Sequence, residues 1–193
     1  MKPILTVVFC LLATGLMLAN EATQALLYFD RQQVAVGNFW SLVTGHFVHA
    51  DWDHLLWNLI GLAVLGYLIE RHSRGLLLLS LGMGIVAVNT LLLSPFSEIQ
   101  LYCGLSGVLN TLLGVALYCR WRETQSLWMP VIGLLSVAKI GVEVHSGASL
   151  FTDISWPPYP LAHLAGLLGA PLVLLIRLWR PCSHQLETSN SAT

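Results

Sequence analysis

The chain has 193 residues, of which 55% are hydrophobic and only 10% are charged. A soluble domain of this size rarely shows that balance, so lipid is the expected solvent for most of the chain. The formal net charge is −1 and no basic arm stands out, which argues against a nucleic-acid partner.

Six apolar segments approach the roughly 17 to 25 residues that a helix needs to cross a bilayer. They cover residues 4–19, 54–69, 76–93, 105–119, 127–142 and 161–179. The expected fold class is an all-α polytopic membrane protein with a bundle of six transmembrane helices. The first segment has a signal peptide as its alternative, but Met17 stands where cleavage needs a small residue. We expect one domain over residues 1–182 and a polar, disordered cytoplasmic tail over residues 183–193.

Lys and Arg residues predict the orientation of these segments, because positive charge gathers on the cytoplasmic side. With the N-terminus inside, the cytoplasmic side receives Lys2, Arg71, Arg74, Arg120, Arg122, Arg177 and Arg180. Arg31 then lies outside and Lys139 lies within the fifth segment. Of the four cysteines only Cys103 would face an oxidising compartment, so no disulfide framework is expected.

Polar residues recur at one depth of the predicted bundle. The second, fourth and sixth segments all run from outside to inside, and each carries polar groups in its first turn. These groups are His54 and Asn58, then Ser106 between Gly104 and Gly107, then His163 before Gly166. Buried polar residues inside membrane spans are costly and often functional. His54 and Asn58, four residues apart, share one helix face, although each of these groups alone also suits a purely structural role.

Ser106 and His163 suit nucleophilic catalysis. A helix start offers unpaired N–H groups for an oxyanion, and a neutral imidazole can accept a serine proton. Ser106 could instead be a helix cap. Small-residue stripes, with Gly107, Asn110 and Gly114 on the fourth segment and Gly166 and Ala170 on the sixth, let the two helices pack closely. No acidic third member is expected at this depth: Asp153 lies in a proline-rich loop, and Lys139 with Glu143 is interpreted as a structural ion pair. The prediction is therefore a dyad.

Several motifs in order resemble those of the rhomboid intramembrane serine proteases. His49 precedes His54-Leu55-Leu56-Trp57-Asn58, Gly104-Leu105-Ser106-Gly107 matches the nucleophile motif G-x-S-G, and Ala162-His163-Leu164-Ala165-Gly166 matches A-H-x-x-G. The resemblance covers roughly residues 38 to 172. It implies Ser106 as nucleophile, His163 as general base, and an oxyanion and substrate site formed by His54, Asn58, Gly104 and Leu105 with the Ser106 N–H. Gly107, Asn110, Gly166 and His49 would support the site.

Two positions depart from the family pattern. Trp40-Ser41 stands where many rhomboids have Trp-Arg, so the first loop is expected to be anchored differently. Asn110 stands where many relatives have a Tyr that packs on the catalytic histidine, and it could hydrogen-bond His163 instead.

The stretch Gly45-His46-Phe47-Val48-His49 and the short six-span core look most like the rhombosortase subgroup. That resemblance implies a bacterial inner-membrane enzyme opening to the periplasm. Its substrates would be secreted proteins with a C-terminal Gly-Gly motif, an anchor helix and a basic tail. We expect neither cofactor nor metal.

Two alternatives remain open at this point. One is a catalytically inactive rhomboid relative that binds membrane clients. The other is a metal or proton pathway built from His46, His49, Asp51, Asp53 and His54.

Overall fold

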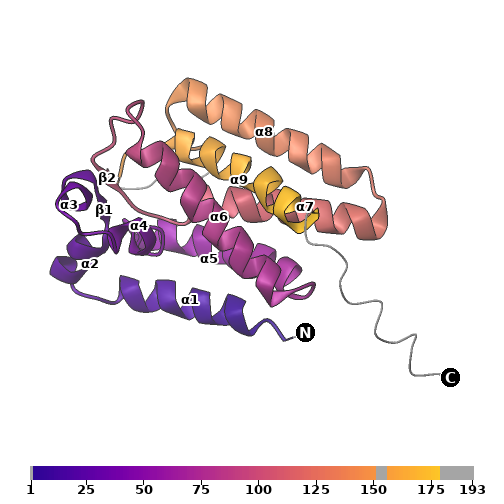
Figure 1. The fold of residues 1–193 in the computed structure, drawn as a ribbon, viewed down its shortest axis with the longest axis horizontal. Coiled ribbons are helices and arrows are strands. Elements are labelled where there is room, and N and C mark those ends of the chain that lie inside the picture. The colour runs from indigo at the N-terminus through magenta and orange to yellow at the C-terminus, as the bar shows by residue number, and fades with distance from the viewer. Residues whose placement is uncertain (1, 151–155, 179–193) are drawn as a thin grey trace.

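The computed structural model describes residues 2–150 and 156–178. Its longest elements are α1 (Ile4–Met17), α5 (Trp52–Glu70), α6 (Arg74–Leu93), α7 (Ser106–Thr124), α8 (Trp128–Ser146) and α9 (Pro160–Leu178). These helices form one bundle, with α1 and α8 at opposite edges of it in Figure 1. The predicted tail over residues 183–193, Asp153 and Cys182 lie outside the described residues.

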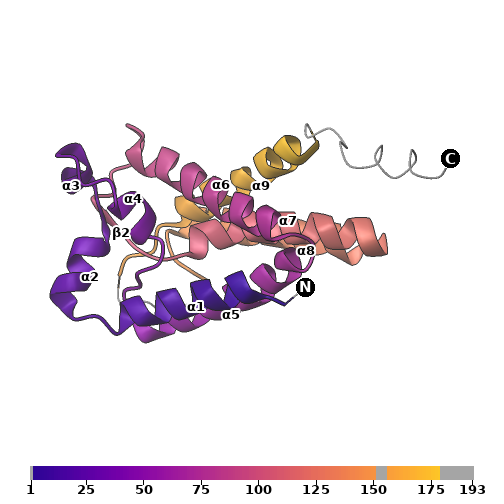
Figure 2. The ribbon, with the colours of Figure 1, turned by 60° about the horizontal axis from the view of Figure 1, so that its bottom comes forward.

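Short elements gather at one end of the bundle (Figure 2). They are α2 (Glu21–Leu27), β1 (Phe29–Asp30), α3 (Arg31–Ala35), α4 (Ser41–Thr44) and β2 (Leu101–Tyr102). The two strands pair antiparallel, with Phe29 opposite Tyr102. The pairing therefore ties the first loop to the segment that leads into α7.

Each of the six predicted spans corresponds to one long helix. Four of these helices, α5, α6, α8 and α9, are long and apolar enough to cross a membrane, and α1 is a shorter apolar helix. The fourth, α7, continues past its apolar part through Arg120 and Arg122 to Thr124. An apolar run marks the hydrocarbon depth and not the end of the helix, so α7 extends beyond the predicted span that ends at residue 119. The polytopic all-α fold class is confirmed.

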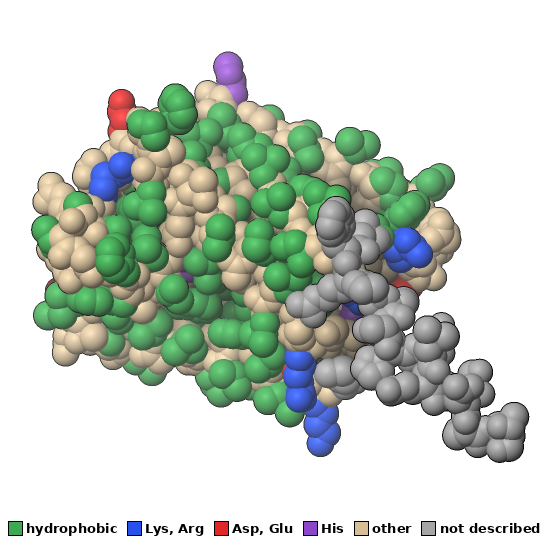
Figure 3. Space-filling view, viewed as in Figure 1, with side chains coloured by type: hydrophobic (Ala, Val, Ile, Leu, Met, Phe, Trp, Pro, Cys, Tyr) green, Lys and Arg blue, Asp and Glu red, His purple; other side chains and the backbone are tan. Residues whose placement is uncertain are grey.

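Apolar side chains cover much of the outer surface, as Figure 3 shows for one face. Leu11, Leu134 and Leu168 are between 60% and 70% exposed although each lies within a helix. A lipid-facing helix surface explains this exposure, because hydrocarbon tails are as apolar as leucine.

The α7–α9 contact is a backbone-to-backbone packing of small residues. A Cβ atom built on Gly166 would lie 1.8 Å from the Gly107 carbonyl oxygen, and one on Gly114 would lie 2.5 Å from the Ala170 Cβ. The Thr111 hydroxyl donates a hydrogen bond to the Gly166 carbonyl across the same contact. The predicted meeting of the fourth and sixth spans is thus confirmed, and it brings the first turns of the two helices together.

The N-terminus of α1 is held by a carboxylate from another helix. Glu70, fully buried at the end of α5, accepts hydrogen bonds from the Leu5 N–H at 2.9 Å, the Thr6 N–H at 2.8 Å and the Thr6 hydroxyl at 2.8 Å. Pro3 at the N-cap position supplies no side-chain cap, so Glu70 satisfies amides that the helix leaves unpaired. It also places negative charge at the positive end of the α1 dipole. The first predicted span is therefore part of the bundle.

We expect Glu70→Ala to lower the thermal unfolding temperature in detergent micelles. The substitution leaves the Leu5 and Thr6 amides without an acceptor, at a cost of about 1–3 kcal/mol for each buried unsatisfied group. Glu123→Ala serves as the control, because its partly exposed ion pairs with Arg120 and His72 contribute little. Equal unfolding temperatures for the two variants would show that Glu70 does not anchor α1.

Candidate active site

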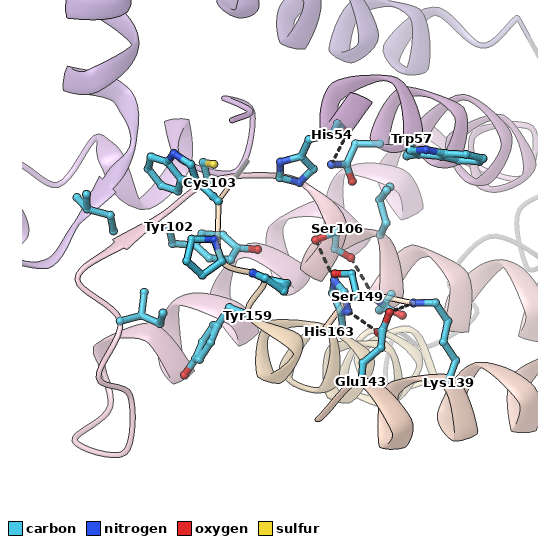
Figure 4. Close-up of a pocket in the computed structure, with 18 residues that line it drawn as sticks. His54, Trp57, Tyr102, Cys103, Ser106, Lys139, Glu143, Ser149, Tyr159 and His163 are labelled. Carbon is cyan, nitrogen blue, oxygen red and sulfur yellow. Dashed lines mark hydrogen bonds and ion pairs between the residues drawn. The ribbon is translucent and has the colours of Figure 1, made fainter. Parts of the chain in front are cut away.

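A cavity of about 230 Å³ lies where the first turns of α5, α7 and α9 meet the last turn of α8 (Figure 4). Its lining includes Trp57, Asn58, Ser106, Asn110, Glu143 and His163. The groups that the sequence placed at one depth therefore share one cavity, together with a carboxylate from α8.

Ser106 is the first residue of α7 and does not act as a helix cap. The N-cap position belongs to Leu105, which is buried, and no side-chain capping bond is present at this helix start. The Ser106 Oγ instead lies 3.0 Å from the His163 Nε2. Since Ser106 is at the first helical position, its own backbone N–H has no partner within the helix. Ser106 thus carries both a hydroxyl and a backbone N–H that is available to donate a hydrogen bond.

His163, in the first turn of α9, contacts polar groups through both ring nitrogens. Its Nε2 faces Ser106, and its Nδ1 lies 3.0 Å from the Glu143 Oε2 (Figure 4). The three side chains form a continuous array of carboxylate, imidazole and hydroxyl. Such an array can move a proton from the hydroxyl to the imidazole while the carboxylate faces the far nitrogen.

Glu143 corrects the expectation that no acidic residue would reach this depth. The predicted ion pair is present, with the Lys139 Nζ 2.6 Å from the Glu143 Oε1, but the second carboxylate oxygen faces His163. The last turn of α8 lies at the depth where α5, α7 and α9 begin, because residues from all four helix ends line the same cavity. Applying the depth argument to the end of the fifth span would have found Glu143.

His54 and Asn58 are both buried and both line the cavity, as their shared helix face predicted. Asp51 caps α5 by accepting the His54 N–H at 2.7 Å, and the Asn58 Nδ2 donates to the His54 carbonyl at 3.0 Å. An amide nitrogen carries two hydrogens, so Asn58 retains a second donor.

Gly104 is required by its backbone and by the His54 ring. Its φ is +106°, and a Cβ at this position would lie 2.4 Å from the nearest His54 ring atom. Gly104, two residues before Ser106, therefore allows the His54 ring to sit directly against the segment that leads into α7.

Asn110 contacts Ser106 and not His163. Its Nδ2 donates to the Ser106 carbonyl at 2.9 Å. The polar contacts of the His163 ring within the described part of the chain are with Ser106 and Glu143. The hypothesis that Asn110 replaces the usual tyrosine by bonding His163 was therefore wrong, because a residue on α8 occupies the free ring nitrogen.

His49 and His46 are neutral histidines buried beside the site. Burial lowers the pKa of His49 to about 3 and that of His46 to about 4. The His49 ring packs edge-on against the His54 ring with centroids 5.0 Å apart, which supports the orientation of His54.

The metal alternative gains no support from this geometry. Within residues 2–150 and 156–178, no three His, Cys, Asp or Glu side chains gather as a metal site. Asp51 is used as the cap of α5, and Asp53 is exposed.

Cys103 is a second potential nucleophile in the cavity lining. Burial raises the pKa of its thiol to about 12, so this thiol stays protonated at neutral pH. Ser106, with a base at hydrogen-bond distance, is the better-prepared nucleophile.

Comparisons with known proteins place the chain in a family. The model of the Rhomboid domain matches residues 36–180. "RHOMBOID-like protein 6, mitochondrial" of Arabidopsis thaliana is 27% identical over 182 residues, which are 90% of this chain and 55% of that protein. "Putative rhomboid protease YdcA" of Bacillus subtilis (strain 168) is 27% identical over 147 residues, which are 72% of this chain and 68% of that protein. The chain thus spans about half the length of the first relative. Because the Rhomboid domain matches most of the length of this chain, the chain belongs to the rhomboid family.

Proposed function

We propose that this protein is an intramembrane serine endopeptidase in which Ser106 is the nucleophile and His163 the general base. The observation that carries the proposal is the 3.0 Å contact between the Ser106 Oγ and the His163 Nε2, inside a cavity at the ends of membrane-spanning helices. Each residue type alone has common structural roles. Their pairing beside unused hydrogen-bond donors supports catalysis.

The reaction would proceed by acyl transfer. The His163 Nε2 takes the Ser106 proton while the Ser106 Oγ attacks the scissile carbonyl, and a tetrahedral oxyanion forms. Protonated His163 then gives its proton to the leaving amine, the C–N bond breaks, and an acyl-enzyme on Ser106 remains. A second nucleophile, water or another amine, attacks the acyl-enzyme with His163 again as base and restores Ser106.

His54, Asn58 and the Ser106 N–H are the proposed oxyanion donors. They come from the first turns of two different helices, and rigid helix starts hold such donors in place before the charge develops. The His54 Nδ1 is buried and has no hydrogen-bond partner among the described residues. The ring proton that is available for donation to the oxyanion is therefore one on the other ring nitrogen, Nε2.

We expect His54→Ala and Asn58→Ala each to lower kcat by about 10²- to 10³-fold, the usual effect of losing one oxyanion donor. The measurement is the initial rate of cleavage of an anchored substrate in proteoliposomes. Asp53→Ala, an exposed change in the same turn, should keep the wild-type rate. A loss of activity in Asp53→Ala together with inhibition by a chelator would favour the metal alternative.

The proposed site opens to the outer side of the membrane. Lys and Arg distribution supports this orientation, since Arg71 and Arg74 lie where α5 ends and α6 begins, at the end away from Ser106. Water would reach the acyl-enzyme from that outer side. We propose the inner membrane of a bacterium as the location, with both chain ends in the cytoplasm and the cavity facing the periplasm.

The proposed substrate is a membrane-anchored protein with a C-terminal anchor helix preceded by a Gly-Gly motif. The support for this narrower class is the resemblance of the first-loop stretch at residues 45–49 to the rhombosortase subgroup. A Gly-Gly sequence also lets the substrate backbone approach the nucleophile closely, because glycine has no side chain.

The experiment is cleavage of two reporter proteins, both co-reconstituted with the enzyme in proteoliposomes. One carries Gly-Gly before its C-terminal anchor and the other carries Ala-Val at the same place. We expect release of the first reporter alone. Equal release of both would support the protease but refute the Gly-Gly preference, and release of neither would refute the proposed substrate class.

A further inference from the structure

Glu143, on the last full turn of α8, contacts the proposed base from the side opposite the nucleophile. We infer that Glu143 is a positioning residue for His163, so that the site works as a Ser–His–Glu triad. This inference rests on the proposed function and adds to it the residue that selects the tautomer of the base.

The two Glu143 oxygens have separate partners. Oε1 accepts from the Lys139 Nζ at 2.6 Å and from the Leu150 N–H at 3.1 Å. Oε2 lies 3.0 Å from the His163 Nδ1. The side chain is 1% exposed. A carboxylate fixed by two donors on one oxygen has little freedom to leave His163, so the contact is held in place by the structure around it.

A plain ion pair with Lys139 would not require this arrangement. An ion pair at i and i+4 forms readily on an exposed helix face, where it contributes a few tenths of a kcal/mol. Here Glu143 and Ile140 are the buried residues of α8, and the second carboxylate oxygen is aimed at the ring of His163. The buried carboxylate of α8 thus contacts the ring of His163.

The carboxylate determines which ring nitrogen carries the proton. An ionised carboxylate only accepts hydrogen bonds, so the His163 Nδ1 must donate. In the neutral ring the Nε2 is then left with a lone pair facing the Ser106 hydroxyl. That is the tautomer in which the ring can take the serine proton.

The same contact stabilises the charge that develops on the ring. When Ser106 gives up its proton, His163 becomes an imidazolium with Glu143 3.0 Å from its other nitrogen. While the His163 ring is neutral, the positive charge of Lys139 balances the negative charge of the Glu143 carboxylate. Glu143 itself keeps its charge throughout and does not take the proton, as in the serine-protease triad.

The test is Glu143→Gln, which keeps the size of the side chain. If its amide N–H₂ faces the His163 Nδ1, that nitrogen must accept and the Nε2 must carry the proton, which blocks it as a base. In a triad with the acid replaced by its amide, the loss in kcat is about 10⁴-fold. We expect a loss of 10²- to 10⁴-fold in kcat with KM changed less than threefold, and partial rescue by Glu143→Asp, which restores a carboxylate.

His145→Gln is the matched control, since it makes a Gln substitution at an exposed position in the same helix turn. It should cleave at the wild-type rate. The second readout is ¹⁵N NMR of histidine-labelled protein in micelles, with His163 assigned from its missing signal in His163→Ala. Wild type should show the Nδ1–H tautomer and Glu143→Gln the Nε2–H tautomer.

The outcomes separate this inference from the proposed function. Cleavage by Glu143→Gln at the wild-type rate, or loss of rate with an unchanged His163 tautomer, would overturn the positioning role while leaving the dyad in place. If the wild type showed no cleavage that depends on Ser106, the proposed function would be refuted. The tautomer is read without substrate, so it decides whether Glu143 sets the ring state even in that case.

Discussion

Ser106→Ala is expected to abolish release of the anchored reporter from proteoliposomes. The substitution removes the atom that bonds to the scissile carbonyl, so no acyl-enzyme can form. Loss of the nucleophile in a serine hydrolase lowers kcat by roughly 10⁶-fold. We expect cleavage below detection in an overnight reaction at an enzyme concentration where the wild type is complete within minutes.

The matched control is Ser136→Ala. Ser136 is a half-buried serine on α8 whose hydroxyl donates to the Ile132 carbonyl of its own helix. This variant should behave as wild type, which shows that loss of a serine in a span is not itself damaging. Cleavage persisting in Ser106→Ala at the rate of the Ser136→Ala control would rule out the serine mechanism.

Gly166→Ala is the second change with a large expected effect, and it acts through packing. The added Cβ would lie 1.8 Å from the Gly107 carbonyl oxygen, so α7 and α9 must move apart. Overpacking commonly costs 1–3 kcal/mol and occasionally more, and a clash with backbone belongs at the upper end because backbone cannot change rotamer. The separation occurs one helical turn from His163. A displacement of about 1 Å there can cost roughly 10²-fold in rate.

Gly141→Ala makes the same substitution in α8, at a glycine whose added Cβ would meet nothing within 4 Å. We expect it to retain both unfolding temperature and cleavage rate, while Gly166→Ala loses both. The measurements are thermal unfolding in micelles and initial rates in proteoliposomes. If Gly166→Ala matched Gly141→Ala in both, the close α7–α9 contact would not be what brings Ser106 to His163.

Much of the architecture could be predicted from the sequence because lipid imposes a simple rule. Backbone polar groups in a bilayer must be satisfied internally, so each long apolar segment forms a helix. Successive spans alternate in direction, so the second, fourth and sixth run the same way, and the Lys and Arg positions predict which side is cytoplasmic. This direction placed Ser106, His163 and His54 at one depth, and the small residues of α7 and α9 indicated which two helices meet.

Glu143 escaped prediction because its nearest partner in the sequence gave a sufficient local explanation. Lys139 lies one helical turn earlier, and an ion pair at that spacing satisfies both charges. The contact with His163 is set by how α8 and α9 pack, and no spacing within one helix reports it. Glu70 was missed for the same reason, since the amides it binds belong to α1, more than 60 residues away in the chain.

The most direct measurement of the central claim is the mapping of a fluorophosphonate adduct by mass spectrometry. The probe reacts with a serine whose proton is taken by an adjacent base, and it needs no knowledge of the substrate. We expect the adduct on the peptide that contains Ser106 in the wild type and no adduct in His163→Ala. An adduct on another residue, or equal labelling of Ser106 when His163 is replaced, would contradict a nucleophile activated by His163.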